Sequence, residues 1–360
     1  MGRRKSIERD EPRAVTFRRR VKSIPIVLSL FVVVTALLPV VLLVAAVADI
    51  YWMTVKKKPA VFIRVIVFSE GYLIAEFVGM IALLVTWIVS LGGRNQRILR
   101  GSAFWVQQAW AGWMMWVAVK AFRIKLEVEG RENATPGPYI EFIRHSSIVD
   151  NVLSAVTISG PLRIELNYVL KRELLADPCF DIAGRRLTNH FVNRDSGDPR
   201  EIDRVRALTS NLSERQGALI YPEGTRVSDK RRLKALKAIG KNRPERAEKM
   251  SVLKYCLPPR HGGPLALLDA APEADVVLVV HAGLEGMRGI KDVIDGGLVD
   301  TRIVVQIIRV PRASIPAGPA AADWLDDTWI AIDHWVGEAV EAIEAGGAVP
   351  SFTVPEPVTV

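Results

Sequence analysis

The residues best suited to chemistry are His145 and Asp150, which lie five positions apart in the string HSSIVD. A histidine removes a proton from a hydroxyl efficiently only when its ring is held in one tautomer, and a neighbouring carboxylate can hold it. Five residues on one regular helix would not bring the two side chains together, so we expect His145 in a turn and Asp150 on the first turn of the following helix. Ser146 and Ser147 are suitable N-cap residues for that helix. Taken alone, the pair is equally compatible with a structural histidine.

A second group of candidate residues lies in the string YPEGTR, Tyr221 to Arg226. A tight turn at Gly224 that exposes backbone N–H groups beside an arginine is a candidate phosphate site. Between the two strings lies FVNR, whose Arg194 offers a bidentate fork to a phosphate monoester. Each string is by itself also compatible with a solvated turn and a surface arginine.

The strings around His145 and Gly224 follow segments that the pattern predicts to be β-strands. Ile124, Leu126 and Val128 alternate with charged residues, as in a half-exposed strand. Other strand candidates are 137–144, 218–221, 276–280 and 303–308, and runs such as VVLVV are typical of strands buried on both faces. Residues 199–212 and 252–271 leave room for helices or loops, and 321–345 has helical apolar spacing. We therefore predict an α/β fold with a central β-sheet packed by helices.

The N-terminal third is apolar enough to enter a membrane, in a chain that is 49% hydrophobic. Residues 24–50 are long enough to cross a hydrocarbon core of about 30 Å, and residues 61–91 predict a second span. A cleavable signal peptide is the alternative for the first stretch, which far exceeds a signal core of roughly 7 to 15 residues. Glu70 and Glu76 in the second stretch are functional candidates or carboxylates that face a partner helix. The four tryptophans of residues 104–122 predict an interfacial helix, with a helix whose tryptophans fill a core as the alternative.

The net charge of +9 is concentrated in two segments. Residues 1–22 carry nine Lys/Arg against three acidic residues, and residues 226–254 carry eleven against three. The rest of the chain is net acidic, which argues against a nucleic-acid-binding protein. Basic residues before the first span and directly after the second exceed those between them, so we expect the N-terminus and the bulk of the chain on the cytoplasmic side.

These features predict five segments along the chain. They are a basic cytoplasmic tail (1–22), two transmembrane helices (23–92), a Trp-rich interfacial helix (93–122), a catalytic domain (123–312), and a C-terminal helix with a Pro-containing tail (313–360). Cys179 and Cys256 are too few and too far apart for a disulfide scaffold or a four-ligand zinc site. The other histidines show no metal-ligand spacing, and no nucleotide-binding fingerprint is present. We therefore expect neither a metal nor a bound cofactor.

The order HSSIVD, FVNR, YPEGTR and an apolar strand at 276–281 resembles the four sequence blocks of the glycerolipid acyltransferase family, which includes the lysophosphatidic acid acyltransferases. Lys171, in KREL ahead of the second block, also resembles a segment of that family. LPPRHGG and the Trp-rich stretch 324–333 are similar to the longer, eukaryotic-type branch. The resemblance covers about residues 123–340. Departures are Arg144 in place of Asn, Asn193 in place of Asp, and Val227 in place of Ser.

The resemblance implies a mechanism for these residues. His145 is the general base on the free hydroxyl of a lysophospholipid, Asp150 orients it, and the hydroxyl attacks an acyl thioester directly. The acyl donor is acyl-CoA or an acyl carrier protein, and the preferred acceptor is 1-acyl-glycerol-3-phosphate, which gives phosphatidate. The acceptor's phosphate end is held by Arg194, Glu223, Gly224, Thr225, Arg226 and Lys171. The basic segment 226–254 is either a binding surface for the phosphates of coenzyme A or for an anionic leaflet, or a solvated loop.

Three alternatives remain at this point. The first is acylation of a different lysophospholipid, and the second is a lipid hydrolase that uses Ser146 or Ser147, although neither lies in a GxSxG elbow. The third is a non-catalytic, membrane-anchored lipid-binding protein.

Overall fold

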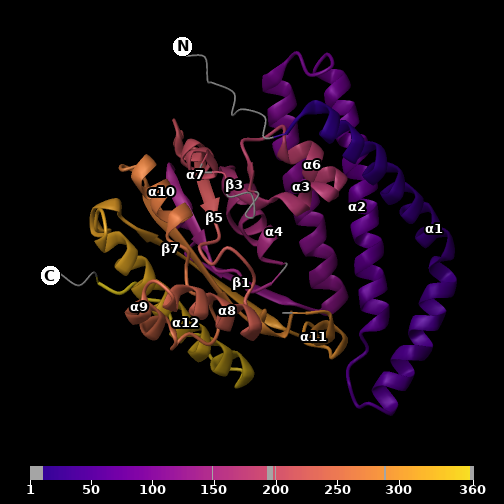
Figure 1. The fold of residues 1–360 in the computed structure, drawn as a ribbon. Coiled ribbons are helices and arrows are strands. Elements are labelled where there is room, and N and C mark those ends of the chain that lie inside the picture. The colour runs from indigo at the N-terminus through magenta and orange to yellow at the C-terminus, as the bar shows by residue number, and fades with distance from the viewer. Residues whose placement is uncertain (1–10, 148, 193–197, 199, 288, 357–360) are drawn as a thin grey trace. The chain divides into compact units, whose positions relative to one another are not determined.

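The computed structural model describes residues 11–147, 149–192, 198, 200–287 and 289–356. The chain forms two compact units, which are shown with their elements labelled in Figure 1. The first unit contains the chain up to Phe122 together with Asn167–Leu208, and the second contains Arg123–Leu166 together with Thr209–Val360. This division cuts across the predicted catalytic segment 123–312, because the chain leaves the second unit and returns to it. The boundaries predicted from the sequence stay a prediction.

Three long helices form most of the first unit: α1 (Arg13–Thr54), α2 (Phe62–Val89) and α3 (Gln96–Phe122). Helix α1 begins at Arg13, within the basic segment 1–22, and it contains Pro25 and Pro39. Helices α1 and α2 are long and apolar enough to cross a membrane, by length and composition. The prediction of two apolar N-terminal helices is therefore confirmed, and they indicate membrane association.

Polar groups join α1 to α2 in two places. Asp49, near the end of α1, is buried and accepts hydrogen bonds from the backbone N–H groups of Val61, Phe62 and Ile63 at 2.7–3.0 Å. These N–H groups have no partner within their own helix, so Asp49 caps α2 from the preceding element. Glu70 accepts a 2.6 Å hydrogen bond from Thr35 Oγ1 of α1, and thus faces a partner helix.

Helix α3 packs closely against α2. The indole N–H of Trp110 donates to Glu76 at 2.9 Å, and that of Trp113 donates to the carbonyl of Gly71 at 2.8 Å. A Cβ atom at Gly71 would lie 2.8 Å from Val117 Cγ1, so only glycine permits this approach. Two of the four tryptophans thus face α2, whereas Trp105 and Trp116 are more than half exposed. The interfacial position of α3 stays a prediction.

The sequence did not reveal two parallel strands, β3 (Glu165–Lys171), which belongs to the first unit from Asn167 onward, and β4 (His190–Val192) in the same unit. Polar Asn167 interrupts the apolar pattern of β3, and its side-chain amide donates to the carbonyl of Leu208. The remaining elements of this unit are the 3₁₀ turn η3 (Arg172–Ala176), α6 (Pro178–Gly184) and α7 (Arg200–Arg206).

The second unit is built on five strands in the order β1-β7-β6-β2-β5. Only the β6–β7 pair is antiparallel, and the other three pairs are parallel. Every residue of β2 and β5 is buried, as expected for strands covered on both faces. The strands are β1 (Lys125–Glu129), β2 (Tyr139–Ile143), β5 (Gln216–Ile220), β6 (Asp275–Ala282) and β7 (Arg302–Val310). All five were predicted, and the predicted α/β fold is confirmed.

Helices cover this sheet. Helix α10 (Gly262–Ala270) packs against β2 and β5, and α12 (Ala320–Glu344), yellow in Figure 1, packs against β6. The basic segment 226–254 forms two helices, α8 (Asp229–Gly240) and α9 (Pro244–Met250), where the sequence left a loop as an alternative. The other helices are α4 (Asp150–Ser154), continued by a π-helical turn at Ala155–Ser159, α5 (Gly160–Leu162) and α11 (Ile290–Ile294).

The buried carboxyl of Glu141 on β2 makes stability depend on pH. Burial raises its pKa from 4.5 to about 8, although a hydrogen bond from Ser154 Oγ lowers it. The folded protein therefore holds a proton that the unfolded chain releases, so the free energy of unfolding falls as the pH rises from about 4.5 to about 8.

We expect Glu141→Gln to remove this dependence. The variant and the wild type should melt alike near pH 5, and the variant should be more stable at pH 8 by up to a few kcal/mol, since one pKa unit is worth about 1.4 kcal/mol. Thermal unfolding of the full chain in detergent at both pH values measures the difference. Parallel shifts of the two proteins with pH would contradict this assignment.

Candidate active site

The centre of the candidate site is the turn between β2 and α4. His145 leaves the end of β2, and Asp150 is the first residue of α4. His145 Nδ1 lies 3.2 Å from Asp150 Oδ2, and both side chains are buried. This is the local arrangement that the spacing predicts. The predicted serine caps are not formed, because Asp150 Oδ2 itself accepts from the N–H of Ser147 at 2.7 Å, and Ser147 Oγ accepts from the N–H of Val149.

The environment keeps Asp150 ionised. Burial raises the pKa of its carboxyl, but His281, His145 and the Ser147 N–H together hold the pKa below its usual value. His281 Nε2 lies 3.2 Å from the Arg144 carbonyl and 3.5 Å from Asp150 Oδ1. Burial holds the pKa of His281 below its usual value, although Asp150 opposes this shift. An ionised Asp150 is a hydrogen-bond acceptor for Nδ1–H of His145, and a His145 tautomer with its proton on Nδ1 would leave Nε2 free to act as a base.

Tyr221, at the end of β5, holds the other side of this pair. Its hydroxyl donates to the Asp150 carbonyl at 3.0 Å, and its ring centroid lies 4.4 Å from that of His145. The string YPEGTR is therefore packed directly against HSSIVD. The backbone N–H of Val227 also donates to the His145 carbonyl at 3.1 Å.

Glu223 ties three segments of the second unit together. Its Oε1 accepts from the His145 N–H at 3.0 Å and from the Trp329 indole, and its Oε2 accepts from the Leu257 N–H at 3.0 Å. The side chain is 2% exposed, and burial raises its pKa to about 7 although these hydrogen bonds and Arg144 lower it. The sequence assigned Glu223 to phosphate binding. A buried carboxylate that already accepts from three groups repels a phosphate, so the geometry supports a positioning role instead.

Gly224 forms the turn that the sequence predicts. Its φ of +71° belongs to the left-handed region, and its N–H donates to the Tyr221 carbonyl at 2.8 Å. A Cβ atom at this position would lie 3.0 Å from Cδ and Nε of Arg260. The half-buried Thr225 and Arg226 follow directly. Arg260, in the string LPPRHGG, thus lies against the turn, and we did not identify it from the sequence because Arg260 is 34 residues from Arg226.

Arg144, a departure from the family pattern, is a fully buried organiser of the site. Its guanidinium donates to the His281 carbonyl and to Glu285 Oε1 at 2.8 Å, and to the Tyr255 carbonyl at 2.9 Å. Burial lowers the pKa of Arg144, but Glu285 and other acidic neighbours raise it further, so the charge is retained. Arg144 directly precedes His145, so these hydrogen bonds hold the end of β2 against the segments that carry His281 and Tyr255.

Helix α12 positions the loop before LPPRHGG through two carboxylates that we did not identify from the sequence. Asp333 accepts from the N–H groups of Lys254, Tyr255 and Cys256 at 2.6–3.0 Å. Asp326 pairs with Arg246 through both oxygens, at 2.7 and 2.8 Å, and lies 2.9 Å from His261 Nε2. These contacts make the helix an anchor for the segment that bears Arg260.

The remaining candidate residues from the sequence are Lys171, Arg194, Ser146 and Ser147. Lys171 is the last residue of β3 in the first unit. Arg194 lies outside the described residues. Ser146 and Ser147, the nucleophiles of the hydrolase alternative, are both fully buried. Within the described part of the chain, no group of three or more His, Cys, Asp or Glu side chains has the geometry of a metal site.

Comparison with known proteins finds a similarity to acyltransferases. Residues 125–257 match the family model described as Acyltransferase, and this range includes HSSIVD and YPEGTR. A similar solved structure is that of the 1-acyl-sn-glycerophosphate (LPA) acyltransferase PlsC from Thermotoga maritima. It is 14% identical, has a TM-score of 0.47, and the match covers 78% of this chain and 97% of that one. No curated protein sequence gives a significant match.

Glu223→Gln tests the positioning role. Because both carboxylate oxygens accept from N–H groups, the amide must turn its NH₂ toward one of those donors, and we expect a loss of about 1–3 kcal/mol in stability. Glu141→Gln is the matched control, since that carboxyl receives one hydrogen bond from a hydroxyl group. Thermal unfolding at pH 8 compares each variant with the wild type. Glu141→Gln is expected to be at least as stable as the wild type there, and a Glu223→Gln variant that is no less stable than the wild type would argue against the role.

Proposed function

We propose that this chain, whose residues 125–257 match the acyltransferase family, transfers an acyl group from a thioester to the free hydroxyl of a lysophospholipid. The observation that carries the proposal is the contact of His145 Nδ1 with the buried Asp150, inside the matched domain. The acceptor that we propose is 1-acyl-glycerol-3-phosphate, with phosphatidate as the product.

In the proposed mechanism, His145 is the general base. Asp150 accepts a hydrogen bond from Nδ1–H and stays ionised, so Nε2 takes the proton of the acceptor hydroxyl as its oxygen attacks the thioester carbonyl. A C–O bond forms, the C–S bond breaks, and the imidazolium returns the proton to the leaving thiolate. The ionised state of Asp150 stabilises the positive imidazolium that exists between these steps. Neither serine is needed as a nucleophile.

The phosphate end of the acceptor is proposed to bind at the Gly224 turn. Arg226 directly precedes Val227, whose N–H bonds to His145, so the guanidinium starts close to the reacting group. Among the described residues, the Arg226 side chain has no carboxylate partner, and Arg260 lies against the same turn. Two guanidinium groups suit a dianionic phosphate monoester better than a diester. Thr225 completes this set, and Lys171 and Arg194 stay further candidates.

The donor is proposed to be acyl-CoA, with an acyl carrier protein as the alternative. Helix α8 has no buried residue and carries five of the eleven basic side chains of the segment 226–254. Exposed lysines and arginines on one helix suit the phosphates of coenzyme A or the acidic surface of a carrier protein. No bound cofactor is required by this chemistry.

The reaction is proposed to take place at the cytoplasmic leaflet. Nine basic residues precede the apolar part of α1, and Arg94, Arg97 and Arg100 directly follow α2. The positive-inside rule then places the N-terminus and both flanks of the helix pair in the cytoplasm. The two apolar helices would hold the domain beside a pool of lysophospholipid in the membrane.

His145→Ala tests the base. Purified protein is supplied with labelled acyl-CoA and 1-acyl-glycerol-3-phosphate, and phosphatidate and free thiol are measured. We expect the substitution to lower kcat by roughly 10²–10⁴-fold, the range that general base catalysis contributes. His334→Ala, on an exposed position of α12, is the control and should keep full activity. Activity that survives in His145→Ala would refute the assignment, and transfer to other lysolipids alone would redirect the acceptor.

Arg226→Gln and Arg260→Gln test the phosphate site. We expect each to raise KM for 1-acyl-glycerol-3-phosphate by about tenfold or more, as for loss of a charge-assisted hydrogen bond, without changing KM for acyl-CoA. The control is Arg123→Gln, because this arginine forms an exposed ion pair with Asp300. Steady-state kinetics with each substrate varied in turn measure both constants. Equal effects on the two substrates, or no effect, would contradict a phosphate site at this turn.

A further inference from the structure

The first unit contains a cavity with its own charge chemistry, outside the site proposed for acyl transfer. It has a volume of about 610 Å³ and lies between the start of α1, the end of α2, the start of α3, and α6 with the residues that follow it. Its charged wall includes Arg13, Arg20, Arg185 and Arg186, and Glu11 is the acidic residue in that wall.

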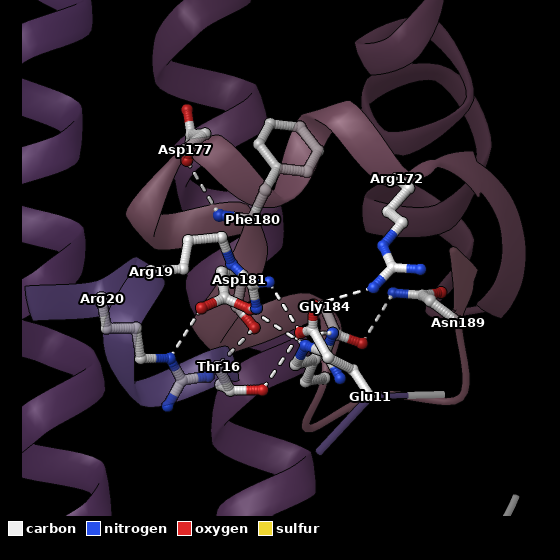
Figure 2. Close-up of polar contacts among 11 residues, drawn as sticks. Glu11, Thr16, Arg19, Arg20, Arg172, Asp177, Phe180, Asp181, Gly184 and Asn189 are labelled. Carbon is white, nitrogen blue, oxygen red and sulfur yellow. Dashed lines mark hydrogen bonds and ion pairs between the residues drawn. The ribbon is translucent and has the colours of Figure 1, made fainter. Parts of the chain in front are cut away.

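Two buried carboxylates beside this cavity are already saturated with arginines, as Figure 2 shows. Glu11 contacts Arg19 at 2.6 Å, Arg185 at 2.8 Å and Arg172 at 2.9 Å. Asp181, on α6, contacts Arg20 at 2.6 Å and also pairs with Arg19 and Arg185. Two negative charges thus serve four guanidinium groups, and the cluster keeps an excess of positive charge.

Arg186 adds to that excess. Its Nη1 donates to the Leu83 carbonyl at 2.9 Å and to Thr86 Oγ1 at 3.0 Å, both neutral acceptors. Among the described residues it has no carboxylate partner. Burial and the positive charge of Arg20 both lower the pKa of Arg186, which indicates two cations facing the same space. An anion in the cavity would relieve their repulsion and restore the charge balance.

The rest of the lining identifies the class of anion. Trp87, Leu99 and Phe191 add large apolar surfaces to the same lining. Trp87 belongs to the last turn of α2, so the cavity lies at the end of an apolar helix that is long enough to cross a membrane. At that level lipid headgroups meet the first acyl carbons, and a tryptophan is typical of this boundary. A ligand with a phosphate at one end and apolar carbons at the other matches both walls.

We propose that this cavity binds an anionic phospholipid, with the headgroup phosphate between Arg20 and Arg186 and the upper part of the lipid against Trp87 and Leu99. The site lies entirely within the first unit, and it goes beyond the proposed acyl transfer. It would select membranes that contain anionic lipid, through guanidinium forks that recognise phosphate.

The test measures lipid binding and does not depend on activity. The full chain is purified in a neutral detergent, and native mass spectrometry counts the lipids retained after titration with phosphatidylglycerol, phosphatidylcholine or inorganic phosphate. We expect retention of phosphatidylglycerol in preference to phosphatidylcholine. Arg186→Gln and Arg20→Gln should each weaken that retention by about tenfold, as for loss of one charge-assisted contact.

Arg97→Gln is the matched control, because Arg97 is an exposed arginine on α3 outside the cavity lining. It should retain phosphatidylglycerol as the wild type does. Arg186 also bonds to α2, so Arg20→Gln keeps the test valid if Arg186→Gln does not fold. Equal retention by the wild type and Arg20→Gln, or equal retention of the zwitterionic lipid, would overturn the proposal. Binding of inorganic phosphate as tight as that of the lipid would show a site for a free anion, and would also overturn it.

Discussion

The candidate active site depends on the burial of carboxylates whose oxygens accept hydrogen bonds from the protein. Asp150 and Glu223 are almost completely buried, and a charge without partners at such positions would cost several kcal/mol. Each carboxylate accepts hydrogen bonds from groups of different segments. These segments must therefore keep their relative positions for the carboxylate to stay buried. Asp150 can remain ionised only while His145, Ser147 and His281 keep their places. Glu223 likewise requires the His145 turn, Leu257 and Trp329 together.

The same constraint explains how Arg144 is accommodated next to the proposed base. A guanidinium is tolerated in the interior only if its N–H groups find acceptors. Arg144 finds them in two carbonyls and Glu285, which lie more than 100 residues further along the chain. Arginine in place of the family's asparagine therefore has acceptors for its N–H groups in this chain. The strand end that carries His145 is fixed by Arg144 on one side and by Glu223 on the other.

The sequence reveals the parts of the site that are local, and it hides those that are not. The strands of the second unit were predictable because they are mainly apolar runs or, in β1, alternate apolar and charged residues. His145 with Asp150 was predictable because the turn between them is local. The strand β3 was hidden because Asn167 places a polar group in the core, where the Leu208 carbonyl accepts its hydrogen bond. The roles of Glu223 and Asp333 were hidden because their partners are backbone N–H groups 34 to 79 residues away. Every residue except proline has a backbone N–H, so the sequence does not indicate which of these groups will donate to a given carboxylate.

The arginines of the two units differ in the number of carboxylate partners that they have. In the second unit, Arg144 and Arg246 each have a carboxylate partner and otherwise donate to backbone carbonyls. In the first unit, Glu11 and Asp181 are shared among four arginines, and Arg186 has only neutral acceptors among the described residues. Positive charge without a carboxylate partner is unfavourable beside an apolar wall, and it becomes favourable when an anionic surface supplies the missing negative charge. The charge distribution of the first unit therefore suits the boundary of a membrane, whereas that of the second suits a rigid site that holds one proton acceptor in place.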